Sequence, residues 1–186
     1  MNFVDLSDHK FIVEPRYYYY GWSVSPKILG RSSAVRALVH ARNLLPKGWN
    51  FKIWDMQRPR AVQLAMISSF QRRFKVEFPK ICAKERTDLV FKFAAKPLAR
   101  VTRIDTHRNG GAVDLTIVDN FEEELYMGTD HDNLSDKAAL NYYENIKRPN
   151  SVEKLARDNR RLLSMVLAKA GFENYTPEWW HWSYPK

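Results

Sequence analysis

The chain has 186 residues, of which 45% are hydrophobic and 27% are charged, and its formal net charge at pH 7 is +9. This composition is typical of a globular protein, and the length suits one domain with a substantial core. No stretch is apolar enough to span a membrane, and no signal peptide is visible at the start. The single cysteine, Cys82, excludes an intrachain disulfide framework and fits a reducing compartment. We therefore expect one domain, residues 1–186, located in the cytoplasm without membrane association.

The positive charge is spread along the chain and is densest in its middle. Nucleic-acid-binding proteins usually carry a recognition helix, an aromatic RNA-binding signature or a basic tail, and none of these is recognisable here. A solvated basic face explains the charge better than a binding surface does. We expect no specific nucleic-acid partner, although steeply salt-dependent binding would revive that alternative.

In the first half of the chain, an aromatic run, YYYYGW (residues 17–22), suits a strand or a cleft wall, and packing is its more common role. Apolar residues at helical spacing predict a helix that begins after the capping serines Ser32 and Ser33 and runs to Leu45. Residues 50–54 alternate apolar and polar side chains and predict a strand. A second helix is predicted from Pro59 to about Lys75, with Leu64 among its inward positions.

The second half begins with a short predicted helix at residues 88–95. Residues 112–118 predict a strand with Val113 on its apolar face and Asp114 on the opposite face. A return strand is expected near residues 123–126. The clearest helix spans residues 151–170, with Val152 and Leu155 on its inward face and Gly171 at its end. Residues 172–175 and 178–184 predict two closing strands.

Two segments carry the residue types of a metal site, DTHRNGGAVD (residues 105–114) and EWWH (residues 178–181). His107, Asp114 and His181 offer two imidazoles and a carboxylate, a set that suits zinc and leaves one position open for water. The two glycines of the first segment permit a tight turn. Glu178 remains as an unligated carboxylate for proton transfer, but its spacing from His181 requires a turn or bulge. By spacing alone, a zinc site and structural histidines are equally good interpretations.

Two further segments have open interpretations. Arg58 lies where a predicted strand passes into a helix, so rigid elements on both sides suit it to binding an oxyanion. The Arg-Pro dipeptide by itself favours a surface salt bridge instead. The loop MGTDHD (residues 127–132) contains two carboxylates and a histidine. It fits a solvated acidic loop and a site for a cationic group equally well.

The four motifs together resemble those of the D-alanyl-D-alanine dipeptidases, the vancomycin-resistance type of zinc peptidase. HRNGGAVD (residues 107–114) is similar to that family's His-x-x-Gly-x-Ala-x-Asp motif, and EWWH to its Glu-x-x-His motif. RPRA (residues 58–61) and MGTDHD match two further motifs, although Gln57 replaces the family's tyrosine. The resemblance covers roughly residues 50–182. It implies a single-domain α+β fold, shared with D-alanyl-D-alanine carboxypeptidases and the Hedgehog signalling domain, with a central, mostly antiparallel sheet flanked by helices.

The same resemblance implies the chemistry. The expected activity is zinc-dependent hydrolysis of a dipeptide, either D-alanyl-D-alanine or a related one, with one Zn²⁺ per chain. The resemblance implies that His107, Asp114 and His181 bind the metal ion and that Glu178 acts as the general base. It also implies that Arg58 stabilises the oxyanion and that Asp132 binds the substrate's free ammonium group.

One residue departs from the family pattern at the substrate site. Asp105 stands where members usually have a serine that helps to receive the dipeptide's carboxylate. We expect Asp105 to face the substrate and to disfavour a free carboxylate there. Two alternatives remain open, a peptidoglycan carboxypeptidase or endopeptidase of the same fold, and a zinc-containing binding domain without hydrolysis. The sequence does not predict the oligomeric state.

Overall fold

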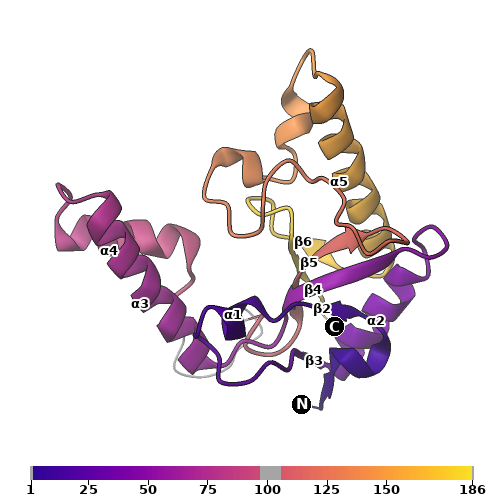
Figure 1. The fold of residues 1–186 in the computed structure, drawn as a ribbon, viewed down its shortest axis with the longest axis horizontal. Coiled ribbons are helices and arrows are strands. Elements are labelled where there is room, and N and C mark those ends of the chain that lie inside the picture. The colour runs from indigo at the N-terminus through magenta and orange to yellow at the C-terminus, as the bar shows by residue number, and fades with distance from the viewer. Residues whose placement is uncertain (1, 97–105, 186) are drawn as a thin grey trace.

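The structure is a computed structural model that describes residues 2–96 and 106–185. A five-stranded sheet forms its centre (Figure 1). The strands lie in the order β2 (Ile12–Val13), β4 (Asn50–Asp55), β5 (Ala112–Val118), β7 (His181–Ser183) and β6 (Glu173–Asn174). The β2–β4 pair is parallel and the other three pairs are antiparallel. A separate antiparallel pair joins β1 (Phe3–Asp5) and β3 (Leu29–Arg31).

The helices complete the predicted α+β fold, which is confirmed. They are α1 (Arg16–Tyr19), α2 (Ser32–Arg42), α3 (Arg60–Glu77), α4 (Ala83–Phe93) and α5 (Ser151–Lys169). Short 3-10 turns occur at η1 (Leu6–His9), η2 (Asp136–Ala138) and η3 (Tyr142–Asn145). No helix within the described ranges is long and apolar enough to cross a membrane.

The main core lies between the sheet and the helices α2 and α5. Alternate residues of β4 and β5 share one face of the sheet and are fully buried, among them Phe51, Ile53 and Leu115. Leu38 of α2 and Leu163 of α5 belong to the same cluster. Burying a large apolar side chain contributes about 1.5–3 kcal/mol, so this cluster holds the sheet rigidly. The opposite face carries the buried polar residues Asp114 and Thr116 beside Trp54.

Helix α5 shows where a periodic pattern misleads. The Asn150 side chain accepts a hydrogen bond from the Glu153 backbone amide, and the Glu153 carboxylate accepts one from the Asn150 backbone amide. This capping box fixes the predicted start of the helix. Val152 and Leu155, predicted to face inward, are exposed, whereas Arg160 is buried. The Arg160 guanidinium donates to three backbone carbonyls, those of Met127, Lys137 and Ala139. This arginine therefore fixes the loop that carries MGTDHD.

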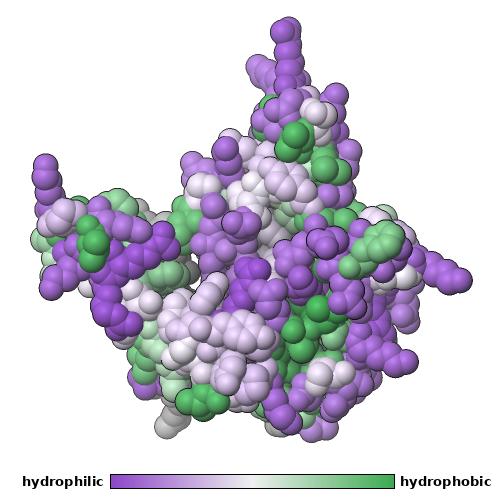
Figure 2. All heavy atoms as spheres, viewed as in Figure 1, coloured by the Kyte–Doolittle hydropathy of each residue, from purple (hydrophilic) through white to green (hydrophobic). Residues whose placement is uncertain are grey.

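Helices α3 and α4 form a hairpin to one side of the sheet (Figure 1). On the face that Figure 2 shows, a notch separates the upper part of this hairpin from the rest of the molecule. A second, smaller cluster holds the hairpin together and includes Phe70, Phe74 and Val90. Leu64, expected inward, is 39% exposed. Helix α4 begins earlier than residue 88, because Cys82 and Glu85 form a capping box.

The aromatic run and the expected return strand differ from the prediction. Residues 16–19 form the one-turn helix α1 rather than a strand, with Tyr17 buried and the next three tyrosines exposed. The return strand near residues 123–126 is reduced to one bridge between Val118 and Glu124. The closing strands are shorter than predicted, because a turn separates β6 from β7.

Candidate active site

Two strands and one turn bring three candidate metal ligands together. Asp114 of β5 and His181 of β7 are direct partners in the antiparallel pair, so their side chains share one face of the sheet. The Nδ1 atom of His181 lies 3.0 Å from Oδ1 of Asp114. The Nε2 atom of His107 lies 3.1 Å from His181 Nδ1 and 3.3 Å from Asp114 Oδ2. The three candidate ligand atoms lie within 4.8 Å of one another.

The turn before β5 depends on its glycines. The amide of Gly110 donates to the His107 carbonyl, and the amide of Gly111 donates to Thr106. Gly110 has φ 68°, and a Cβ there would lie 2.8 Å from the backbone nitrogen of Arg31. A side chain would thus meet both backbone strain and a backbone clash. The tight turn expected between His107 and Asp114 is present.

A second layer of groups orients His107. Its Nδ1 atom lies 2.8 Å from the Met56 carbonyl oxygen and 3.1 Å from Oδ2 of Asp55. Because both neighbours only accept, they favour a hydrogen on Nδ1 and turn Nε2 toward the other two candidate ligands. Metal-binding histidines are commonly fixed in this way. The sequence analysis assigned no role to Asp55. Its position three residues before Arg58 was the feature that could have pointed to it.

Arg58 lies inside the site rather than in a surface salt bridge. Its side chain is 11% exposed, and it donates to Asp55 at 2.8 Å and to Asp114 at 3.0 Å. It also donates to the Tyr17 hydroxyl at 3.0 Å and to Gln63 at 3.1 Å. Burial opposes its charge, but Tyr17 and the two aspartates outweigh burial and raise the pKa of Arg58. The guanidinium is therefore charged, and its four hydrogen-bonding partners fix its orientation.

Tyr17 is a site residue for which the sequence offered only an aromatic run. The centre of its ring lies 4.8 Å from the Arg58 guanidinium carbon, and its hydroxyl oxygen accepts a hydrogen bond from the same guanidinium. Burial raises the pKa of Tyr17 well above its usual value, so the phenol stays protonated.

Asp114, by contrast, remains ionised. Burial would raise its pKa, but the charge of His107 and the close approach of His107, His181 and His131, at 3.3, 3.0 and 3.7 Å, hold that pKa well below the usual range.

The segment after Pro177 forms a turn. Such a turn was expected because Glu178 and His181 are three residues apart and would face opposite ways on a regular strand. The Glu178 amide donates to the Tyr175 carbonyl at 2.8 Å, and the His181 amide donates to the Glu178 carbonyl at 3.3 Å. Burial raises the pKa of the Glu178 carboxyl to about 7; His181 and Arg58 oppose this rise, and Asp114 and Asp132 add to it. A carboxyl group with this pKa can both accept and return a proton near neutral pH.

The MGTDHD loop places His131 between two carboxylates. Its Nδ1 lies 3.5 Å from Oδ2 of Asp132, and its Nε2 lies 3.7 Å from Oδ2 of Asp114. The ring packs on Trp54 with centroids 4.7 Å apart. Asp132 adopts φ 59°, a left-handed conformation that aspartate tolerates, and its side chain is 32% exposed. Sequence analysis gave His131 no role of its own. Asp105, the other expected substrate contact, lies outside the described residues.

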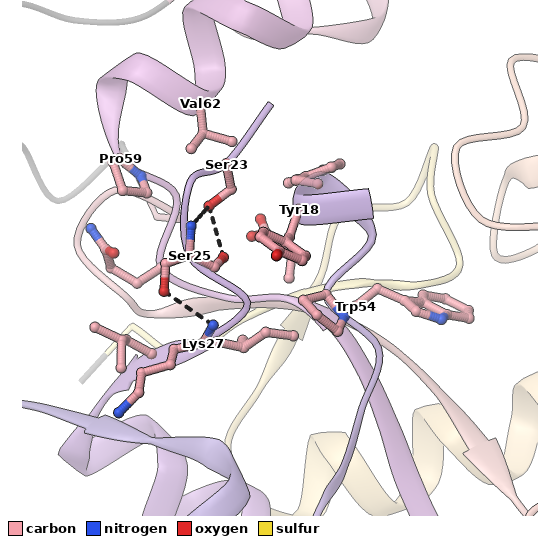
Figure 3. A pocket seen from close by; sticks show the side chains of 13 residues that line it. Tyr18, Ser23, Ser25, Lys27, Trp54, Pro59 and Val62 are labelled. Carbon is pink, nitrogen blue, oxygen red and sulfur yellow. Dashed lines mark hydrogen bonds between the residues drawn. The ribbon is translucent and has the colours of Figure 1, made fainter. Parts of the chain in front are cut away.

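A small cavity of about 120 Å³ adjoins the site at Asp55 and is lined by 13 residues, none of them a candidate metal ligand (Figure 3). Ser23 and Ser25 fold the chain around it, because Ser25 donates its amide to the Ser23 hydroxyl and Lys27 donates its amide to the Ser25 hydroxyl. The cavity is thus a feature of the segment that packs beside β4.

The family model of the D-Ala-D-Ala dipeptidases matches residues 22–186 of the chain. The chain belongs to this family. Membership confirms the resemblance that the four motifs carry, and it makes the protein a metallopeptidase. His107, Asp114 and His181 form a group that could hold the metal ion of such an enzyme.

Individual family members show the same likeness. A D-alanyl-D-alanine dipeptidase of Synechocystis is 29% identical over 175 residues, covering 86% of this chain and 70% of the relative. The Enterococcus faecium protein of the same name is 28% identical over 169 residues, covering 87% and 75%. One from Escherichia coli is 33% identical over 86 residues, which cover 46% of this chain and 41% of that protein.

Proposed function

We propose that this chain is a zinc-dependent dipeptidase that hydrolyses D-alanyl-D-alanine or a related dipeptide. One observation carries the proposal: His107, Asp114 and His181 converge within 4.8 Å beside a carboxyl group, Glu178, whose pKa is about 7. Membership of a family whose relatives are named D-alanyl-D-alanine dipeptidases supports the choice of substrate class.

The donor set fits one zinc ion per chain. Two imidazole nitrogens and one carboxylate oxygen form a set of three protein ligands, which leaves a fourth position open. Cys82 caps the distant helix α4, so no thiolate competes for the ion. When bound, the ion supplies Lewis acidity to a water molecule and to the peptide carbonyl.

The protein groups around the triad then divide the remaining work. Glu178 takes a proton from the attacking water and returns it to the leaving amine, a task that a pKa of about 7 suits in both directions. Arg58 faces the negative charge that develops on the carbonyl oxygen. Because Asp55 and Tyr17 already hold its guanidinium, Arg58 needs little rearrangement as that charge forms.

The two ends of the substrate are recognised by acidic residues. Asp132 pairs with the free ammonium group, which places the N-terminal residue of the dipeptide against residues 127–132. Its partial exposure and its proximity to His131 support this role. We place Asp105 near the C-terminal end of the dipeptide because of its position in the sequence motif, since this residue lies outside the described residues. We also place the enzyme in the cytoplasm, where the exposed Cys82 would stay reduced, and cell fractionation would test this.

A substrate panel tests the proposal. The metal-free protein is loaded with one equivalent of zinc and offered dipeptides, longer peptides and cross-linked muropeptides. Zinc-dependent cleavage restricted to dipeptides is expected. Cleavage of the cross-linked substrates would favour a peptidoglycan carboxypeptidase or endopeptidase. A zinc-loaded protein that cleaves nothing would instead be a binding domain.

A further inference from the structure

The side chain of Arg160, in helix α5, is buried although it carries a positive charge. The residue is only 2% exposed, and no carboxylate of residues 2–96 or 106–185 forms an ion pair with it. Burial lowers the pKa of Arg160 to about 10, so the guanidinium is still charged at neutral pH. A buried charge is costly unless hydrogen bonds satisfy it. The partners of Arg160 therefore indicate what its charge does.

The hydrogen bonds of Arg160 close residues 127–139 into a loop. Its Nε donates to the Met127 carbonyl at 2.8 Å, and its terminal nitrogens donate to the carbonyls of Lys137 and Ala139 at 2.9 and 2.6 Å. Residues 127–134 belong to no helix or strand, so no backbone ladder fixes them. Asp132, which we propose binds the substrate's ammonium group, lies between the two ends. We call residues 127–139 the Asp132 loop.

Arg160 also contacts two aromatic side chains that hold this loop. Its guanidinium carbon lies 4.8 Å from the centre of the Tyr143 ring and 5.7 Å from the centre of the Trp179 ring, within the range of cation–π attraction. The Tyr143 hydroxyl donates to the Gly128 carbonyl at 3.2 Å, and the Trp179 indole nitrogen donates to the Thr129 hydroxyl oxygen at 2.8 Å. Arg160 therefore fixes the loop both directly and through these two rings.

The backbone of Asp132 has a conformation that its surroundings must maintain. Its φ is 59°, in the left-handed region that residues other than glycine seldom adopt and keep only where the surrounding structure fixes them. The Asp132 side chain is 32% exposed, and its Oδ2 lies 3.5 Å from Nδ1 of His131. The direction of the Asp132 carboxylate therefore depends on how firmly the loop is held.

We propose that Arg160 is a positioning residue for recognition of the substrate's ammonium group, and that it acts by fixing the loop that aims the Asp132 carboxylate. The inference rests on the proposed function, in which Asp132 binds that ammonium group. Glu178 has anchors of its own, because its amide donates to the Tyr175 carbonyl at 2.8 Å and the Asn174 side chain donates to its carbonyl at 3.1 Å. Loss of Arg160 thus weakens substrate binding more than it slows the chemical step.

The kinetics of Arg160→Lys test this split. Lysine keeps the charge but loses the planar fork that reaches three carbonyls. With D-alanyl-D-alanine, or the dipeptide that the substrate panel shows to be cleaved fastest, we expect KM to rise about tenfold and kcat to change by less than about twofold. Arg161→Lys, the same substitution at the next and exposed position of α5, is the matched control and should leave both constants unchanged. An unchanged KM, or a fall in kcat as large as the rise in KM, overturns the inference.

Two comparisons show whether the effect passes through Asp132. Arg160→Lys should not change kcat/KM for the analogue in which hydrogen replaces the ammonium group, which is propionyl-D-alanine for D-alanyl-D-alanine. It should also have no further effect in an Asp132→Ala background, because the group that Arg160 positions is then absent. The same loss for the analogue, or in that background, is the result of a purely structural role and overturns the inference but not the proposed function. A wild-type KM in Asp132→Ala overturns the role of Asp132 as well, and cleavage of no dipeptide by the zinc-loaded wild type overturns the proposed function itself.

Folding and zinc content are measured for every variant. Should Arg160→Lys fail to fold, Arg160→Met takes its place, because methionine buries no charge. Failure of both variants to fold would make Arg160 a requirement for stability alone and would overturn the inference.

Discussion

The guanidinium of Arg58 donates a hydrogen bond to Asp114, a candidate metal ligand, across 3.0 Å. The same guanidinium donates to Asp55 at 2.8 Å, and Asp55 lies 3.1 Å from Nδ1 of His107, a second candidate ligand. The group proposed to bind the oxyanion and two groups proposed to bind the metal thus share one buried network. Removing any member leaves a buried charge without its partner, which is costly. For each variant of this network, the zinc content and the free energy of unfolding should therefore be measured together with the rate.

The first prediction concerns the metal. His107→Ala, Asp114→Ala and His181→Ala should each lose bound zinc and activity together, because each removes one of three ligands. Zinc per chain is measured by elemental analysis after dialysis. His40→Ala, on an exposed position of α2, is the matched control and should retain the ion. A triad variant that keeps stoichiometric zinc would remove that residue from the ligand set.

The second prediction separates the base from the ligands. Glu178→Gln should retain zinc, because this carboxylate transfers protons and does not coordinate. Its turnover should fall by about 10²–10⁴-fold, the range for losing a positioned general base. Zinc content and kcat are measured on the same preparation. Loss of zinc equal to that of His181→Ala would show that Glu178 is a ligand instead.

The third prediction concerns Arg58. Arg58→Lys keeps a positive charge but loses the planar fork that reaches Asp55, Asp114 and Tyr17 together. We expect kcat to fall about 10²–10³-fold, the scale for removing one oxyanion donor. Arg60→Lys, exposed at the start of α3, is the control. A near-wild-type rate constant at full zinc occupancy would leave Arg58 a structural ion pair.

The fourth prediction follows from the raised pKa of Glu178. Folding raises this pKa from 4.5 to about 7, so the folded chain binds the proton more tightly than the unfolded chain. The resulting stabilisation is complete below pH 4.5 and is lost as the pH rises through 7. Glu178→Gln cannot ionise and avoids this loss. The metal-free variant should exceed wild type in unfolding free energy by up to about 3 kcal/mol at pH 8 and match it at pH 4.

Denaturant unfolding at the two pH values checks this difference. Glu173→Gln, the same substitution at an exposed position of β6, is the matched control. A Glu178→Gln variant whose difference from wild type is the same at pH 4 and pH 8 would show that burial does not raise this pKa.

The fifth prediction concerns Asp105, whose place is known only from the motif. A carboxylate near the C-terminal end of the dipeptide would repel a free substrate carboxylate by about 1–4 kcal/mol, depending on solvation. Asp105→Ser should therefore improve cleavage of D-alanyl-D-alanine, mainly through a lower KM, and wild type should prefer the C-terminal amide. Steady-state kinetics on both substrates decide this. Wild-type preference for the free acid, with no gain from serine, would place Asp105 away from the substrate.

The sequence predicted those parts of the site that depend on local rules. Alternation along residues 112–118 placed Asp114 opposite the apolar face, and the glycines after His107 predicted the turn that brings the two together. The spacing of Glu178 and His181 required an irregular segment, and a turn occurs there. Each inference used residues within about seven positions of one another, where backbone geometry limits the possible arrangements.

Only the tertiary structure decided which distant groups surround Arg58 and what His131 faces. Tyr17 is 41 residues from Arg58 in the chain, and one hydrogen bond between them leaves no periodic signal in either segment. The burial of Arg160 was equally hidden, because its partners are backbone carbonyls, which every residue possesses. The residues of the motifs thus identified the candidate ligands, and the family resemblance that the motifs carry predicted the fold class. The packing of separate elements determined the charge network and the cavity, since these depend on distances between residues far apart in sequence.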